Sequence, residues 1–138
     1  MTTPRVALWA AVSTPRQAKS DKDSIQSQIR DGRAWAESRG AEVTTIYRVP
    51  GHSRRYIFLP EAARDMPAYH DLMRDCEDGP PWDVLWIRGR DRLGRMDALI
   101  AQVEAVVLQT GAKIYSDATG VMSGDDAAEG ALYVSAFE

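Results

Sequence analysis

The sequence has 138 residues, of which 44% are hydrophobic and 27% charged, and its formal net charge at pH 7 is −3. This length and composition are typical of one globular domain with a buried core, and neither a low-complexity tract nor an internal repeat interrupts it. The single cysteine, Cys76, excludes an internal disulfide and a CxxC metal site, and the acidic balance gives no support to a generally basic nucleic-acid binder.

The first predicted elements are a strand and a helix. Residues 6–12, VALWAAV, form an apolar run without polar alternation, which is typical of a central strand covered on both faces. The run is too short to span a bilayer, and no small-residue cleavage pattern follows it. A helix is predicted next, with Asp23 or Ser24 as its N-cap and Gly40 at its end.

The rest of the chain alternates in the same way. Further strands are predicted at residues 41–47, 83–87 and 112–116. Further helices are predicted around residues 67–77, from Asp97 to Gly111 and over residues 126–138. Residues 48–60 are predicted as a long functional loop and residues 117–125 as a second loop. This alternation predicts an α/β domain with a mostly parallel sheet.

Four arginines crowd the end of the strand predicted at residues 83–87: Arg88, Arg90, Arg92 and Arg95. Ligands of such sheets bind beyond the carboxyl ends of the strands, where Ser13 would also lie. Guanidinium forks match phosphate oxygens, so neighbouring strands would create a phosphate site with a serine aimed at it. Arg95 also lies near a predicted helix start, which favours anions. Taken separately, Ser13 would be a cap or turn residue, and the arginines would pair with nearby Asp or Glu at the surface.

Three segments together resemble the motifs of the serine recombinases, the resolvase/invertase family, in order and spacing. They are VSTPRQ at residues 12–17, SIQSQ at residues 24–28 and DRLGR at residues 91–95. The resemblance implies one catalytic domain over residues 1–138, with a mixed, mostly parallel four- to five-stranded sheet and helices on both faces. It also implies that the chain stops at the start of the C-terminal dimerisation helix and that the DNA-binding region is absent.

The resemblance also implies roles for individual residues. Ser13 matches the nucleophile that attacks a DNA phosphodiester, which leaves a 5′-phosphoseryl link and a free 3′-hydroxyl. Arg92 and Arg95 match the groups that stabilise the transition state, and Asp91 matches a residue that orients them or handles a proton. Residues expected to support the site or to bind DNA phosphates are Gln17, Gln28, Arg54, Arg55, Arg64, Arg88 and Arg90.

The partners implied by the resemblance are DNA and further copies of the chain, assembled as dimers and tetramers in the full-length protein. No metal and no cofactor are implied. A cytoplasmic, nucleoid-associated location in a prokaryote or a phage host is expected. DNA recombination, including integration, is therefore the expected process.

The chain departs from the family pattern at several positions, which include Trp9 in place of a tyrosine and Arg64 without a following proline, and two of them concern charge. Ala11 stands where the family has an arginine, and Val49 stands where it has an acidic residue. Loss of one cation that stabilises the transition state costs about 2 to 4 kcal/mol, so either a loop arginine supplies the missing charge or the activity is low. The second hypothesis is thus a catalytically degenerate relative that keeps the fold for protein assembly or DNA docking. A third hypothesis is a small-molecule phosphate binder or a phosphatase. The sequence contains neither the glycine-rich phosphate loop nor the CxxxxxR spacing of those classes, so we rank this hypothesis last.

The remaining conspicuous side chains fit structural roles. Trp82 and Trp86 flank or lie in a predicted strand, and we expect them in the core rather than as base-stacking platforms. Cys76 is expected to be a small core residue. His52 is expected at the surface, and His70 is expected beside the apolar stripe of its helix, without a ligand partner at metal spacing.

Overall fold

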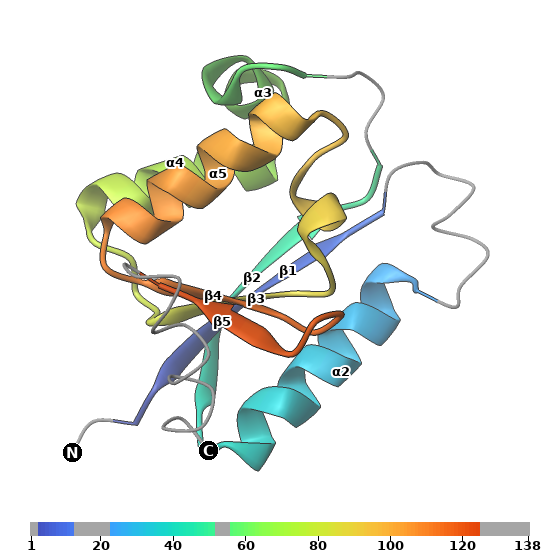
Figure 1. Cartoon of the computed structure of the whole chain (residues 1–138), viewed down its shortest axis with the longest axis vertical. Helices are drawn as coiled ribbons and strands as arrows, with labels where there is room; N and C mark the ends of the chain where they lie inside the picture. The colour runs from blue at the N-terminus through green and yellow to red at the C-terminus, as the bar shows by residue number, and fades with distance from the viewer. Residues whose placement is uncertain (1–2, 13–22, 52–55, 125–138) are drawn as a thin grey trace.

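The computed structural model describes residues 3–12, 23–51 and 56–124 of the chain. The five strands within these ranges form one sheet in the order β2-β1-β3-β4-β5 (Figure 1). Their bounds are β1 Arg5–Ala11, β2 Glu42–Val49, β3 Val84–Ile87, β4 Lys113–Ser116 and β5 Val121–Ser123. The first four strands pair in parallel, and β5 pairs antiparallel with β4. This mixed, mostly parallel five-stranded sheet confirms the predicted fold class.

Helices cover both faces of the sheet. One face carries α2 (Ile25–Ser38), whereas α3 (Leu59–Asp65), α4 (Pro67–Asp78) and α5 (Asp97–Gln109) lie on the other (Figure 1). A short 3₁₀ helix, η1 (Arg90–Leu93), connects β3 to α5. None of the helices in the described ranges is long and apolar enough to cross a membrane.

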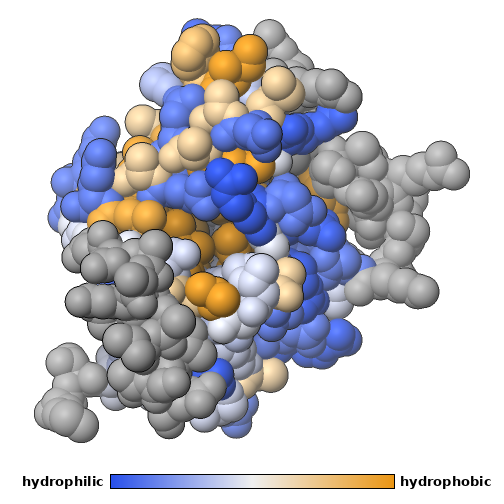
Figure 2. Space-filling view, viewed as in Figure 1, coloured by the Kyte–Doolittle hydropathy of each residue, from blue (hydrophilic) through white to orange (hydrophobic). Residues whose placement is uncertain are grey.

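The ends of α2 follow from its sequence. Ser24 is the N-cap, because its Oγ accepts a hydrogen bond from the Ser27 amide at 3.0 Å. Beyond the last turn, Gly40 has a φ of 66°, a left-handed conformation that glycine adopts without strain. Hydrophilic residues gather over the outer surface of α2 (Figure 2), while Trp35 and Ala36 are buried against the sheet. The helix is therefore amphipathic, as its spacing predicts.

The side chains of β1 alternate between two cores. Ala7, Trp9 and Ala11 pack into the core formed with α3, α4 and α5, whereas Val6 and Leu8 pack into the core formed with α2. Each of these side chains is at most 1% exposed. The strand is thus covered on both faces, as the apolar run predicts.

The tryptophans of the arginine-rich region belong to the core. Trp82 and Trp86 are 1% and 0% exposed, which confirms their expected structural role. Cys76 is half-buried and packs at the margin of the core with α4 and α5. His70 lies at the surface, with its side chain 60% exposed beside Asp71, whereas His52 lies outside the described residues.

The loop predicted over residues 48–60 is wrong at both ends. The second strand continues to Val49, and α3 begins at Leu59. Pro60 occupies the first turn of α3, where a residue without an amide hydrogen costs no helical hydrogen bond. Because proline is also common in loops, Pro60 favoured the prediction of a loop where the helix begins.

The loop predicted over residues 117–125 is also wrong, because it contains β5. Gly120 has a φ of 69° and donates its amide to the Ser116 carbonyl at 2.8 Å, which closes the turn between β4 and β5. The two glycines that flank β5, Gly120 and Gly124, favoured a loop in the sequence. The helix predicted over residues 126–138 lies outside the described residues.

Candidate active site

The carboxyl ends of β1 and β3 lie side by side in the sheet. The two strands pair in parallel, with Trp9 opposite Ile87. Since η1 begins at Arg90, the arginine-rich segment leaves the sheet at this edge. The Arg92 amide donates to the Gly89 carbonyl at 3.0 Å and closes the turn. The neighbouring strands on which the predicted phosphate site depends are therefore present.

Two aromatic side chains fix the backbone of η1. Trp9 Nε1 donates to the Arg92 carbonyl at 2.8 Å, and Tyr69 Oη donates to the Leu93 carbonyl at 2.9 Å. The two rings pack edge to face with their centroids 5.1 Å apart. Burial raises the pKa of Tyr69, so its hydroxyl remains a donor at neutral pH. The turn that carries Arg92 is thereby anchored to the core.

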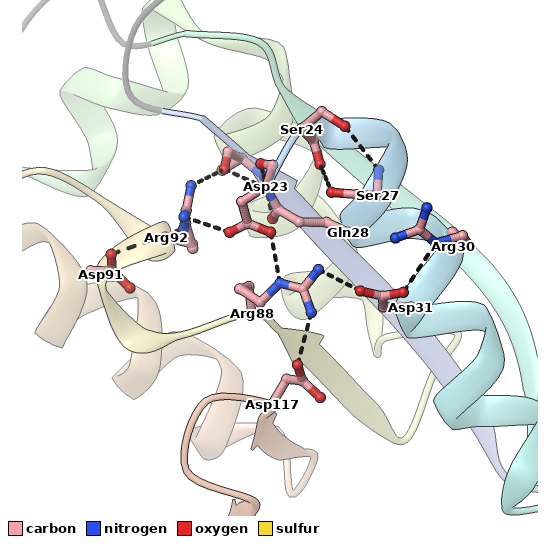
Figure 3. A network of polar contacts seen from close by, with 11 residues as sticks. Asp23, Ser24, Ser27, Gln28, Arg30, Asp31, Arg88, Asp91, Arg92 and Asp117 are labelled. Carbon is pink, nitrogen blue, oxygen red and sulfur yellow. Dashed lines mark hydrogen bonds and ion pairs between the residues drawn. The ribbon is translucent and has the colours of Figure 1, made fainter. Parts of the chain in front are cut away.

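The guanidinium of Arg92 reaches the end of β1. Its Nη1 donates to the Ala11 carbonyl at 3.1 Å, and its Nη2 pairs with Asp23 Oδ2 at 2.5 Å (Figure 3). Its Nε is buried without a hydrogen-bond partner among the described residues, and Asp91 Oδ2 lies 3.9 Å away. Arg92 therefore contacts the backbone two residues before Ser13.

Gln28 ties the end of β1 to the start of α2. Its side chain is fully buried, and its Oε1 accepts from the Ala11 amide at 3.1 Å. Its Nε2 donates to the carbonyls of Ala11 and Asp23, each at 2.9 Å. The Ala11 carbonyl thus accepts hydrogen bonds from both Gln28 and Arg92, which are two of the predicted site residues.

Arg88 lies at the centre of a group of carboxylates (Figure 3). Its Nε donates to Asp23 Oδ1 at 2.7 Å, its Nη2 to Asp31 Oδ2 at 2.7 Å and its Nη1 to Asp117 Oδ2 at 2.8 Å. These carboxylates come from the start of α2, from α2 itself and from the turn after β4. One side chain therefore fastens α2 across the carboxyl edge of the sheet.

The electrostatics of this group favour its charged form. Burial acts to lower the pKa of Arg88, but the hydrogen bonds that it donates to Asp31, Asp23 and Asp117 raise that pKa by more, so the guanidinium stays cationic. The hydrogen bond from Arg88 in turn holds the pKa of Asp31 below its ordinary value. Asp23 contacts both guanidiniums and so joins Arg88 to Arg92.

The other described arginines lie on neighbouring elements. Arg90 forms a two-pronged pair with Glu104 of α5 at 2.9 and 3.0 Å, and that hydrogen bonding raises its pKa. Arg64 lies on α3 with its Nε 3.5 Å from Asp65. Arg95 lies two residues before α5 begins. The expectation that these arginines pair with nearby acidic residues is confirmed for Arg90 and for Arg88 (Figure 3).

Several predicted positions fall outside the described ranges, namely Ser13, Gln17, Arg54 and Arg55. Ala11 and Val49, the two positions predicted to lack a charged residue of the family, are both described and buried, at 1% and 0% exposure. Within the described ranges, no group of three or more His, Cys, Asp or Glu side chains is arranged to hold a metal ion.

Sequence reasoning missed the acidic half of this site. Asp23 was expected only as a possible helix cap, and no role was expected for Asp31 or Asp117. The signal for Asp117 was present, because it directly follows β4, the neighbour of β3, at the same edge of the sheet. The contacts of Asp23 and Asp31 depend on where α2 crosses the sheet, which local sequence does not specify.

Comparisons with known proteins identify the family and the fold. Residues 6–137 match the family described as the resolvase N-terminal domain. The structure is similar to that of the N-terminal catalytic domain of TP901-1 integrase, with a TM-score of 0.71 and 25% sequence identity over 96% of this chain and 90% of that one. It is also similar to a resolvase family site-specific recombinase from Streptococcus pneumoniae, with a TM-score of 0.70 and 18% identity over 97% of this chain and 85% of that one. The second likeness concerns the fold alone. A comparison with curated proteins gives no match.

Proposed function

Because the chain belongs to the resolvase N-terminal domain family, we propose that it is the catalytic domain of a site-specific DNA recombinase that cuts and rejoins DNA through Ser13. One observation carries the proposal: Arg92 Nη1 donates to the Ala11 carbonyl at 3.1 Å, two residues before that serine. A cation fixed beside the attacking hydroxyl stabilises the charge that develops on a phosphodiester during displacement.

In the proposed reaction, Ser13 Oγ forms a bond to phosphorus while the bond from phosphorus to the DNA 3′-oxygen breaks. The serine proton leaves to a base, and the 3′-oxygen takes up a proton, which gives a 5′-phosphoseryl link and a 3′-hydroxyl. Arg92 and Arg95 stabilise the charge on the non-bridging oxygens. Asp91 orients Arg92 or handles a proton; its side chain is 82% exposed and lies 3.9 Å from Arg92 Nε. Rejoining reverses these steps.

The remaining predicted residues have supporting roles in this proposal. Gln28 holds the end of β1, and Arg88 holds Asp23 and α2 in place. The residues proposed to contact DNA phosphates are Gln17, Arg54, Arg55, Arg64 and Arg90. DNA is the proposed substrate, and strand exchange would take place within dimers and tetramers of the protein.

One observation favours a second candidate function. Ala11 and Val49, at positions where the family has an arginine and an acidic residue, are both buried in an apolar core. A relative that keeps the fold for protein assembly or DNA docking, without cleaving DNA, would tolerate this replacement.

A trapping assay separates the two candidates. The intact gene product is incubated with supercoiled plasmid that carries its recombination site, and covalent protein–DNA adducts are mapped by mass spectrometry. The cleavage proposal predicts an adduct that Ser13→Ala abolishes and that Ser123→Ala, a matched change on the exposed edge strand β5, leaves unchanged. Absence of an adduct on a verified site favours the non-cleaving relative. An adduct that persists in Ser13→Ala removes Ser13 from its role.

A further inference from the structure

The Asp23 carboxylate is shared by two guanidinium groups. Its Oδ2 lies 2.5 Å from Arg92 Nη2, and its Oδ1 lies 2.7 Å from Arg88 Nε (Figure 3). The other terminal nitrogen of Arg92, Nη1, donates to the Ala11 carbonyl at 3.1 Å. Both terminal nitrogens of Arg92 are thus engaged by acceptors of the protein itself.

A carboxylate and a phosphodiester compete for the same guanidinium nitrogens, because each presents anionic oxygens that accept charge-assisted hydrogen bonds. The surroundings of Arg92 also disfavour an additional anion. Three guanidiniums, those of Arg30, Arg88 and Arg92, face the four carboxylates of Asp23, Asp31, Asp91 and Asp117 in this network, a formal net charge of −1 (Figure 3). A DNA phosphate would therefore have to replace a carboxylate at Arg92 rather than join it.

We propose that Asp23 occupies the phosphate-binding position on Arg92 Nη2 and that the DNA phosphodiester displaces it there. This inference rests on the proposed function of the site. Arg88 makes the displacement local, because Arg88 Nε continues to hold Oδ1 after Oδ2 has left Arg92. Arg88 itself is retained by Asp31 at 2.7 Å and Asp117 at 2.8 Å, independently of Asp23.

The inference is tested with dimethyl phosphate, the smallest phosphodiester, titrated into the chain and followed by NMR at the Arg92 Nε–Hε signal. That signal is assigned from its loss in Arg92→Lys. The two variants compared are Asp23→Asn and Asp31→Asn, which remove the same charge from the same network. Of these two carboxylates, Asp23 pairs with Arg92 whereas Asp31 pairs with Arg88, so Asp31→Asn controls for the general change in the electrostatic field.

We expect Asp23→Asn to tighten dimethyl phosphate binding by about tenfold, the scale of one hydrogen bond to a charged group. The change in Asp31→Asn should stay below about threefold, as for a charge that acts without direct contact. Equal changes in the two variants would overturn the inference, because general charge would then explain both. Weaker binding in Asp23→Asn would also overturn it, since Asp23 would then position Arg92 for the anion.

Two controls keep the result interpretable. Thermal unfolding shows whether Asp23→Asn is folded, and Asp23→Ser provides a second variant that removes the carboxylate while keeping a small polar side chain. Dimethyl phosphate binding does not require the Ser13 hydroxyl, so the titration is repeated in Ser13→Ala. Tighter binding in Asp23→Asn without any DNA adduct would sustain this inference while refuting the cleavage proposal.

Discussion

Ala11 of β1 and Val49 of β2 lie opposite each other in the parallel register, and both are buried, at 1% and 0% exposure. The strands stay paired just beyond this point, where the Val12 amide donates to the Val49 carbonyl at 3.0 Å. The motif resemblance predicts an arginine and an acidic residue at these two positions. An arginine and an acidic residue placed there would be neighbours across the strands, so we infer that the two apolar residues act as one coupled replacement.

Restoring the charges one at a time should destabilise the protein. Ala11→Arg alone places an unpaired cation in an apolar core, and we expect a loss of about 3 kcal/mol or more in the free energy of unfolding. Val49→Asp alone should have an effect of the same sign. In the double variant the two charges pair, and we expect a favourable coupling energy of about 1 to 3 kcal/mol. Urea denaturation of all four proteins measures the coupling, and additive effects would contradict the paired replacement.

Arg88 should matter far more for stability than Arg90, although both bind carboxylates. Arg88→Met removes one charged hydrogen bond from each of three carboxylates, and only Asp23 and Asp31 keep another arginine partner, so we expect a loss of about 2 to 3 kcal/mol in the free energy of unfolding. Arg90→Met breaks a pair whose arginine is 53% exposed, and the loss should stay below about 1 kcal/mol. Denaturation of the wild type and both variants with guanidinium chloride measures the two losses in the free energy of unfolding. Equal losses would show that the network around Arg88 contributes no more than a surface pair.

The hydrogen bond from Arg88 to Asp31 should make stability fall in acid. The pKa of Asp31 is lower in the folded protein than in the unfolded chain, where it is about 4. The ionised Asp31 therefore adds to the free energy of unfolding above about pH 4, and this contribution is lost as the pH falls through the pKa of the folded state. Asp31→Asn lacks this contribution. The gap in unfolding free energy between wild type and Asp31→Asn should therefore narrow from pH 6 to pH 2.5. A gap that stays constant would contradict the assigned shift.

The thiol of Cys76 should react slowly with alkylating reagents. Burial, together with the nearby Asp75, raises its pKa to about 11, so little thiolate exists at pH 8. Alkylation by iodoacetamide at pH 8 should be about a hundredfold slower than for the urea-unfolded chain, on the basis of thiolate fraction alone. The rate should keep rising with pH beyond pH 9, where a free thiol levels off. A plateau near pH 9 in the folded protein would contradict the raised pKa.

Much of the fold was predictable because its signals are local. The apolar run of β1 specifies a buried strand, the β-branched run of β2 specifies a second strand, and Ser24 and Gly40 delimit α2. Two elements escaped prediction for local reasons as well. Pro60 stands inside the first turn of α3, and glycines flank the three-residue β5, so turn-forming residues concealed regular structure at both places.

The site was predictable only in part. The strand-exit rule selected the arginine-rich segment, and the structure places Arg92 at the end of β1 as that rule requires. The same rule did not foresee that Arg88 and Arg92 share Asp23, because the contact depends on the packing of α2 against the sheet. The position of Asp117 directly after β4 and the acidic balance of the chain were the hints that arginines at this edge would have carboxylate partners.

The role of Arg92 is tested most directly by single-turnover cleavage of supercoiled DNA that carries the recombination site. The rate of 5′-phosphoseryl adduct formation is compared in wild type, Arg92→Lys and Arg74→Lys, a matched change on the exposed side of α4. We predict that Arg92→Lys slows adduct formation about a hundredfold or more at saturating protein, while Arg74→Lys leaves the rate unchanged. An Arg92→Lys variant that remains folded and cleaves at the wild-type rate would contradict the account.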